Sequence, residues 1–160
     1  MISAVTNGPM CFEELQPGQV FEAGPRVIDR SDIDAFTRLS GDRTALHCDD
    51  DYARTTPFGA VVAHGVLALA VGTGLAYDTG IFHGTVLAVR SMEISFERPV
   101  FPGDSLTLRL EVASKDNQPR VDRGRVEFGV RLTNQHGKTA ALGTWTLIMR
   151  RSVESTDPPV

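Results

Sequence analysis

The segment 40–47 reads Ser-Gly-Asp-Arg-Thr-Ala-Leu-His and places a carboxylate and an imidazole five residues apart, at Asp42 and His47. Such a pair can move protons to and from water, because imidazole titrates near neutral pH and a neighbouring carboxylate orients it. Farther along, Ala63-His64-Gly65 opens an apolar segment that reads as a helix. The N–H groups at a helix N-terminus stabilise negative charge on a carbonyl oxygen. Together these residues predict lyase or hydrolase chemistry on an activated carbonyl compound.

Other polar residues near this pair have simpler interpretations. We expect His64 to cap the helix or to pack beneath the site rather than to react. The three adjacent carboxylates at 49–51 cannot easily converge on one ion, so we predict a solvated acidic turn that caps the next short helix, and no metal. Cys48 follows His47 directly, so a thiolate of Cys48 that acts as the nucleophile stays open as an alternative.

The composition is that of a soluble protein with one core. Of the 160 residues 41% are hydrophobic and 22% charged, so we assign a single domain to residues 1–151 and a flexible tail to 152–160. The net charge of −4 gives no general attraction to nucleic acid or anionic membranes. The two cysteines suggest neither a disulfide framework nor zinc, and we find no signal peptide and no apolar run long enough to cross a bilayer. We therefore expect a cytoplasmic protein without a cofactor.

Local patterns predict the elements of the first half. Residues 20–28 read as an extended segment. Ser31 is predicted as the N-cap of a short helix that ends at Gly41, with acidic residues in the first turn where they suit the helix dipole. Residues 42–59 read as an irregular, partly helical excursion. Residues 61–77 are apolar almost all round and rich in small residues, which predicts a helix buried on most sides.

The second half alternates apolar and polar residues as half-buried strands do. We expect strands at 86–89 running into 92–96, at 106–112, at 126–132 and at 140–149, with turns at 98–104 and 134–138. One early strand, a central buried helix and long antiparallel strands make an α+β domain in which one curved sheet packs on a helix. Such a sheet has edges, and pairing an edge with a second copy predicts a homodimer.

With these elements the chain resembles the MaoC-like dehydratases, hot-dog-fold proteins that include the R-specific enoyl-CoA hydratases. Their signature contains an aromatic residue, an apolar residue, a small residue, Gly, Asp, any residue, Asn, Pro, an apolar residue and His. Residues 36–47 follow it, and Ala63-His64-Gly65 matches the family's turn into the central helix, as 98–104 matches a later turn. The resemblance covers roughly residues 12–149. One departure is that Thr44-Ala45 stands where the family has Asn-Pro.

The resemblance implies reversible addition of water to a trans-2-enoyl thioester of coenzyme A or acyl-carrier protein, giving the (R)-3-hydroxyacyl thioester. In that reaction Asp42 and His47 would hold the water and share the proton transfer. The N–H of Gly65 would donate to the thioester oxygen, with His64 beside it. Thr73, two turns further along the helix, stands where related enzymes place a hydroxyl near the water.

Two other functions stay open from the sequence alone. A hot-dog acyl-CoA thioesterase would direct water at the thioester carbon, but these enzymes usually carry their acid on the central helix, and residues 61–77 contain no Asp or Glu. The third hypothesis is a non-catalytic acyl-thioester-binding subunit of a heteromeric dehydratase, although the subunits that play this part lack the Asp and His that this chain keeps. Arg54, Arg90 and Arg98 are candidates for contacting the carrier's phosphates.

Overall fold

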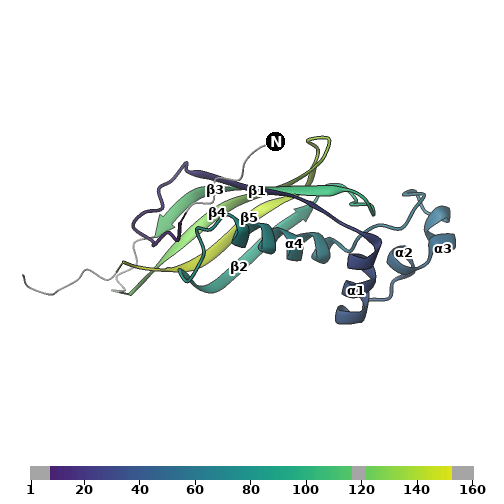
Figure 1. Cartoon of the computed structure of the whole chain (residues 1–160), viewed down its shortest axis with the longest axis horizontal. Coiled ribbons are helices and arrows are strands. Elements are labelled where there is room, and N and C mark those ends of the chain that lie inside the picture. The colour runs from purple at the N-terminus through teal and green to yellow at the C-terminus, as the bar shows by residue number, and fades with distance from the viewer. Residues whose placement is uncertain (1–7, 117–121, 153–160) are drawn as a thin grey trace, which may run out of the picture.

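A computed structural model describes residues 8–116 and 122–152 and shows one curved antiparallel sheet with a helix along it (Figure 1). The strands are β1 (Val20–Val27), β2 (Val86–Phe96), β3 (Ser105–Asp116), β4 (Arg123–Asn134) and β5 (Thr139–Arg150). The helices are α1 (Arg30–Ser40), α2 (Ala45–Cys48), α3 (Asp50–Thr55) and α4 (Gly65–Asp78). The predicted α+β class and its curved sheet are confirmed.

The sheet has the strand order β1-β3-β4-β5-β2, and every neighbouring pair is antiparallel. Successive side chains of a strand point to opposite sides of the sheet, so the alternating apolar residues gather on its inner face. In β3 this buries Leu106, Leu108, Leu110 and Val112, and β4 continues the same face. The predicted strands are confirmed: β3, β4 and β5 extend beyond their predicted limits, and β1 ends one residue before its predicted end. Residues 86–96 form a single edge strand.

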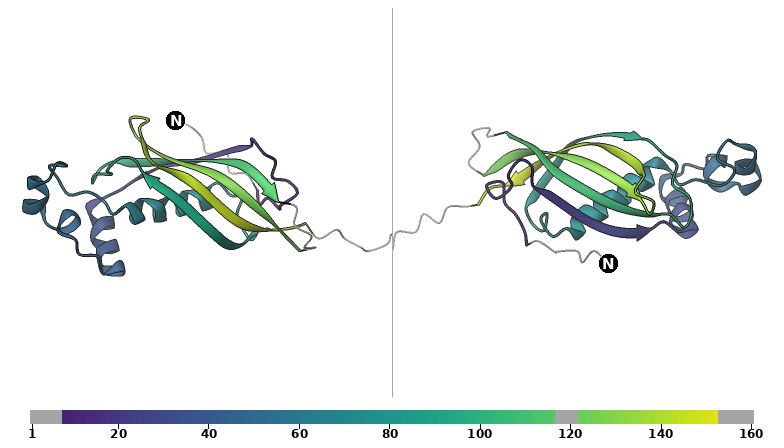
Figure 2. Two further views of the ribbon diagram at one scale, coloured as in Figure 1. Left: turned by 180° about the vertical axis from the view of Figure 1, so that it is seen from behind. Right: turned by 90° about the horizontal axis from the view of Figure 1, so that it is seen from above.

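Helix α4 lies against the inner face of this sheet, and it contacts β1 and β3 (Figure 2). It begins at Gly65 rather than at residue 61, because residues 61–64 run extended and the N–H of Ala63 donates to the carbonyl of Val100 at 2.8 Å. The buried face carries Leu67, Ala68, Gly72, Leu75 and Ala76. On the opposite side Val66 is 58% exposed and Tyr77 is 61% exposed, so the expected burial on most sides is wrong for a single chain.

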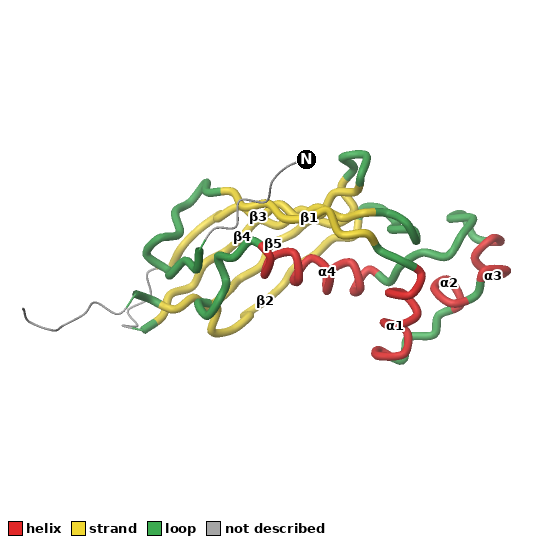
Figure 3. Tube along the Cα trace, viewed as in Figure 1, coloured by secondary structure: helices red, strands yellow, loops and turns green. Residues whose placement is uncertain are grey.

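Helices α1, α2 and α3 form a cluster beyond one end of the sheet, near the start of α4 (Figure 3). The N-cap of α1 is Asp29 and not the predicted Ser31, since the carboxylate of Asp32 accepts from the N–H of Asp29 at 2.9 Å and begins the helix there. The predicted end at Gly41 is confirmed. This glycine has φ of 76°, a left-handed conformation that closes the helix.

The chain termini and one loop lie outside the described ranges. The tail predicted at 152–160 is described only at Ser152, whose N–H and hydroxyl donate to the carboxylate of Glu13. Cys11 and Cys48 are free thiols, as expected. Within the described ranges no helix combines the length and the apolar character needed to cross a bilayer.

Candidate active site

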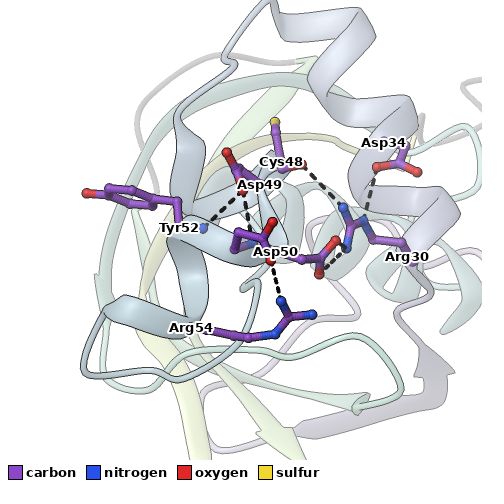
Figure 4. Close-up of polar contacts among 8 residues, drawn as sticks. Arg30, Asp34, Cys48, Asp49, Asp50, Tyr52 and Arg54 are labelled. Carbon is purple, nitrogen blue, oxygen red and sulfur yellow. Dashed lines mark hydrogen bonds and ion pairs between the residues drawn. The ribbon is translucent and has the colours of Figure 1, made fainter.

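The helix cluster at the end of the sheet is held together by one arginine on α1 (Figure 4). The guanidinium of Arg30 contacts both carboxylate oxygens of Asp50 on α3, at 3.0 and 3.1 Å, and the carboxylate of Asp34 at 3.3 Å. It also donates to the carbonyl of Cys48 at 3.4 Å, at the end of α2. Because Arg30 joins three helices, it fixes the segment that carries the predicted catalytic pair.

The acidic run 49–51 begins α3, as the sequence predicts. One carboxylate oxygen of Asp49 accepts from the N–H groups of Asp51 and Tyr52, at 2.9 and 3.0 Å, which caps the helix. Asp50 points to Arg30 and Asp51 pairs with Arg54. The three carboxylates therefore diverge onto separate partners.

His47 sits on the short helix α2 in a fixed tautomer. Its Nδ1 lies 2.7 Å from the carbonyl of Val62. A carbonyl only accepts, so Nδ1 carries the hydrogen and the neutral ring keeps its lone pair on Nε2. The backbone of residues 61–64, extended where a helix was predicted, thus orients the imidazole as a base.

His64 is buried directly beneath His47. The rings of His47 and His64 stack with their centroids 3.8 Å apart. The ring of Phe36 also packs on that of His64, with a centroid distance of 5.0 Å. The Nε2 of His64 donates to the backbone carbonyl of Asp42 at 3.1 Å. Packing beneath the site is confirmed. His64 is also the N-cap residue of α4, as the sequence predicts, although its ring makes no cap hydrogen bond.

The carboxylate of Asp42 is held by its neighbour two residues on. One oxygen, Oδ1, accepts from the N–H of Thr44 at 3.0 Å and from its hydroxyl at 2.7 Å. The other, Oδ2, lies 3.8 Å from Nε2 of His64. The hydroxyl and then the N–H of Thr44 hold the pKa of Asp42 below its usual value, and His64 and His47 act in the same direction. Asp42 is therefore a carboxylate at neutral pH.

Gly65 begins α4 beside this group, and among the described residues its N–H donates to no acceptor. It lines a cavity of about 360 Å³, together with His64, Phe58, Phe96 and Arg98. The ring of Phe96 lies so close that a Cβ built on Gly65 would be 3.1 Å from it. An amide free at the first turn of a 14-residue helix is a good donor for an oxygen that gains negative charge.

The structure brings Asp42, His47 and His64 together: one ring nitrogen of each histidine and one carboxylate oxygen of Asp42 lie within 4.8 Å of one another, and Gly65 follows His64 in the chain. It does not bring Thr73 to them. The Thr73 hydroxyl donates to the carbonyl of Ala70 at 2.7 Å, and its side chain lines a different cavity, between α4 and β2. Eight residues of helix also separate it from Gly65, about 12 Å along the axis.

Sequence reasoning missed two parts of the site. One is the contact from Thr44 to Asp42, which the Asp-x-Thr spacing signals, because Asp side chains accept from residues two positions on. The other is Phe96 above Gly65, for which the sequence holds no local signal. Of the arginines proposed for phosphates, Arg98 lines the cavity and Arg54 pairs with Asp51.

The five-stranded sheet around a central helix is the hot-dog fold, and here an Asp–His pair lies near the start of that helix. A family model described as "MaoC like domain" matches residues 13–135. The chain therefore belongs to the MaoC-like dehydratase family.

Relatives with known names agree with this assignment. The chain is 31% identical over 134 residues to the (R)-specific enoyl-CoA hydratase of Aeromonas caviae, which covers 84% of this chain and 95% of that protein. It is 37% identical over 105 residues, 65% of the chain, to Protein MaoC of Klebsiella aerogenes, but it spans only 31% of that longer protein.

Solved structures share the fold over nearly the whole chain. The R-hydratase PhaJ1 of Pseudomonas aeruginosa superposes with a TM-score of 0.77 at 32% identity, covering 95% of this chain and 96% of that one. A structure described as a monoamine oxidase regulatory protein, from Archaeoglobus fulgidus, gives 0.84 at 28% identity, covering 92% and 99%.

Proposed function

We propose that the protein is an enoyl-thioester hydratase/dehydratase, which adds water reversibly to a trans-2-enoyl thioester of coenzyme A or acyl-carrier protein. The observation that carries this proposal is the cluster of an ionised Asp42, His47 and His64, with His47 oriented by the Val62 carbonyl. Gly65 follows His64 directly, and among the described residues its N–H donates to no acceptor. The names of the A. caviae and P. aeruginosa relatives support the (R)-3-hydroxyacyl thioester as the product.

In the hydration direction the pair acts on one water. The water oxygen bonds to the β-carbon while one of its protons passes to Nε2 of His47, and Asp42 accepts a hydrogen bond that orients the water. The imidazolium that forms is stabilised by the Val62 carbonyl at Nδ1. The electron pair of the double bond moves toward the thioester, and the α-carbon then takes the proton held on Nε2 of His47, which returns the imidazole to its neutral form. The net change is the addition of one water.

Charge builds on the thioester oxygen during this step. The N–H of Gly65 and the positive end of α4 stabilise that charge, and removal of one such donor costs about 2.7–4 kcal/mol in other enzymes. The cavity of about 360 Å³ beside Gly65 gives the thioester access to the amide.

The thioesterase alternative lacks its acid. Helix α4 has one acidic residue, Asp78, at its last position, and this residue is exposed at the far end from the cavity. The alternative of a non-catalytic subunit does not account for the orientation of His47 by Val62, which a binding role does not require. Hydration is therefore the function that the geometry favours.

We also propose a homodimer formed through β2. This strand is an edge of the sheet, and Leu87, Val89 and Phe96 on it are 42%, 54% and 51% exposed. An open apolar cavity of about 220 Å³ continues from β2 onto the exposed side of α4, at Tyr77 and Thr73. A second copy that pairs with this edge would cover both surfaces.

The test is the absorbance loss on hydration of a panel of enoyl-CoA and enoyl-acyl-carrier-protein substrates. Asp42→Asn and His47→Gln are expected to lose about 10²–10⁴-fold in rate, which is the contribution of a positioned acid–base group. Asp51→Asn, an exposed carboxylate in the same segment, is the matched control and keeps full activity. Equal rates for wild type and Asp42→Asn across the panel would end the proposal, and thiol release from saturated acyl-CoA would revive the thioesterase.

A further inference from the structure

We infer that Thr44 is a positioning residue of the site, whose hydroxyl fixes the carboxylate of Asp42 in the orientation that holds the water. This inference rests on the proposed function. It concerns the position at which the chain departs from the Asn of its family's signature, and where threonine supplies a different donor.

The geometry gives Thr44 control over one half of the carboxylate. Its N–H and hydroxyl both donate to Oδ1 of Asp42, at 3.0 and 2.7 Å, so that oxygen is occupied. Only Oδ2 is left to face the imidazoles, 3.8 Å from Nε2 of His64. The terminal torsion of an aspartate is intrinsically broad, and the side chain of Asp42 is 48% exposed. Without the two donors, the carboxylate would rotate and share its position with solvent.

Thr44 also ties the acid to the base. It occupies the N-cap position of α2, and its carbonyl accepts from the N–H of His47 at 2.9 Å. One residue thus bonds through its N–H and hydroxyl to the acid and through its carbonyl to the backbone of the base. Any amino acid other than proline at this position keeps the two backbone contacts. The hydroxyl contact requires Thr or Ser.

The hydroxyl is also the foremost reason that the pKa of Asp42 lies below its usual value. The titratable side chains that face this carboxylate are the imidazoles of His64 and His47, and when protonated they lower the pKa of Asp42 as well. Both donors bond to a charged oxygen, and the hydroxyl makes the shorter contact, 2.7 Å against 3.0 Å for the N–H, and has the larger effect on the pKa of Asp42.

The test compares Thr44→Val, which keeps the shape and loses the hydroxyl, with Thr44→Ser, which keeps the hydroxyl. For Thr44→Val we expect a kcat about tenfold lower with KM within about twofold of wild type, the size expected for one hydrogen bond to a charged group. For Thr44→Ser we expect nearly wild-type kcat. A purely structural role would instead lower the melting temperature of Thr44→Val and leave the kcat of the folded enzyme unchanged.

A second measurement does not depend on turnover. Titration of the Asp42 carboxyl by carbon-13 NMR should show a higher pKa in Thr44→Val than in wild type and Thr44→Ser. An unchanged Asp42 pKa and unchanged kcat in Thr44→Val would overturn the inference, as would a Thr44→Ser variant as impaired as Thr44→Val. If wild type hydrates no enoyl thioester, the proposed function fails, and the carboxyl titration alone decides whether Thr44 holds Asp42.

Discussion

Replacing Gly65 by alanine changes the space in front of its amide without removing the amide. A Cβ at this position would lie 3.1 Å from three atoms of the Phe96 ring. The contact is with the edge of one side chain, which needs to shift by only a few tenths of an ångström to admit the methyl group. Alanine also favours a helix over glycine by up to about 1 kcal/mol. We therefore expect the free energy of unfolding of Gly65→Ala to stay within about 1 kcal/mol of wild type.

Activity should respond very differently. The methyl group enters the cavity that Gly65 lines, on the path that we propose for the thioester oxygen to the N–H. If that approach is blocked, the enzyme loses one oxyanion donor, worth about 2.7–4 kcal/mol or about 10²–10³ in kcat. The assay is kcat and kcat/KM for enoyl-CoA hydration, with the free energy of unfolding measured on the same preparations.

Gly74→Ala is the matched control on the same helix. A Cβ on Gly74 meets nothing within 4 Å, and the residue is exposed. This variant should be as stable as wild type, or more so by up to about 1 kcal/mol, with unchanged kcat. A folded Gly65→Ala enzyme with kcat within about twofold of wild type would refute the role given to the Gly65 amide, since the lost donor is expected to cost far more.

Three further predictions concern Arg30, the charge of Asp42 and the β2 edge of the sheet. Arg30→Leu should lower the free energy of unfolding by about 1 kcal/mol in denaturant titration and lower kcat, whereas Arg54→Leu, which breaks one exposed pair, should change neither measurably. Because the pKa of Asp42 is lowered by folding, its carboxylate stabilises the protein above the unfolded-state pKa, and this stabilisation is lost as pH falls through the folded-state pKa. Wild type should therefore be more stable than Asp42→Asn at neutral pH, with a smaller difference in acid; a difference that grows in acid would contradict this. Val89→Asp, on the β2 edge, should give monomers in analytical ultracentrifugation, whereas Val20→Asp, on the opposite edge, should stay dimeric.

Alternation and turn residues predicted most of the sheet. Leu106, Leu108 and Leu110 are buried on one face because a strand has a period of two, and no distant contact is needed to read this pattern. Gly41 ends α1 for an equally local reason, its left-handed conformation. The Asp–His spacing likewise identified a pair that the fold brings together.

The start of α4, its burial and the place of Thr73 depend on tertiary contacts that the local sequence does not show. The start of α4 was predicted four residues early. Residues 61–64 are extended, and the N–H of Ala63 donates to the carbonyl of Val100. From composition alone, a short apolar segment of this kind cannot be distinguished from the first turn of a helix. The all-round apolar character of α4 predicted burial that one chain does not supply. Thr73 is spaced two turns from Gly65 on that helix, which keeps it at a different cavity within one chain.

The most direct test of the site is a crystal structure with a 3-hydroxyacyl-CoA bound. The product hydroxyl should lie within hydrogen-bonding distance of the Asp42 carboxylate and of Nε2 of His47, and its thioester oxygen should accept from the N–H of Gly65. A hydroxyl bound away from both side chains, or a thioester seated in the cavity beside Thr73, would contradict the proposed hydration site.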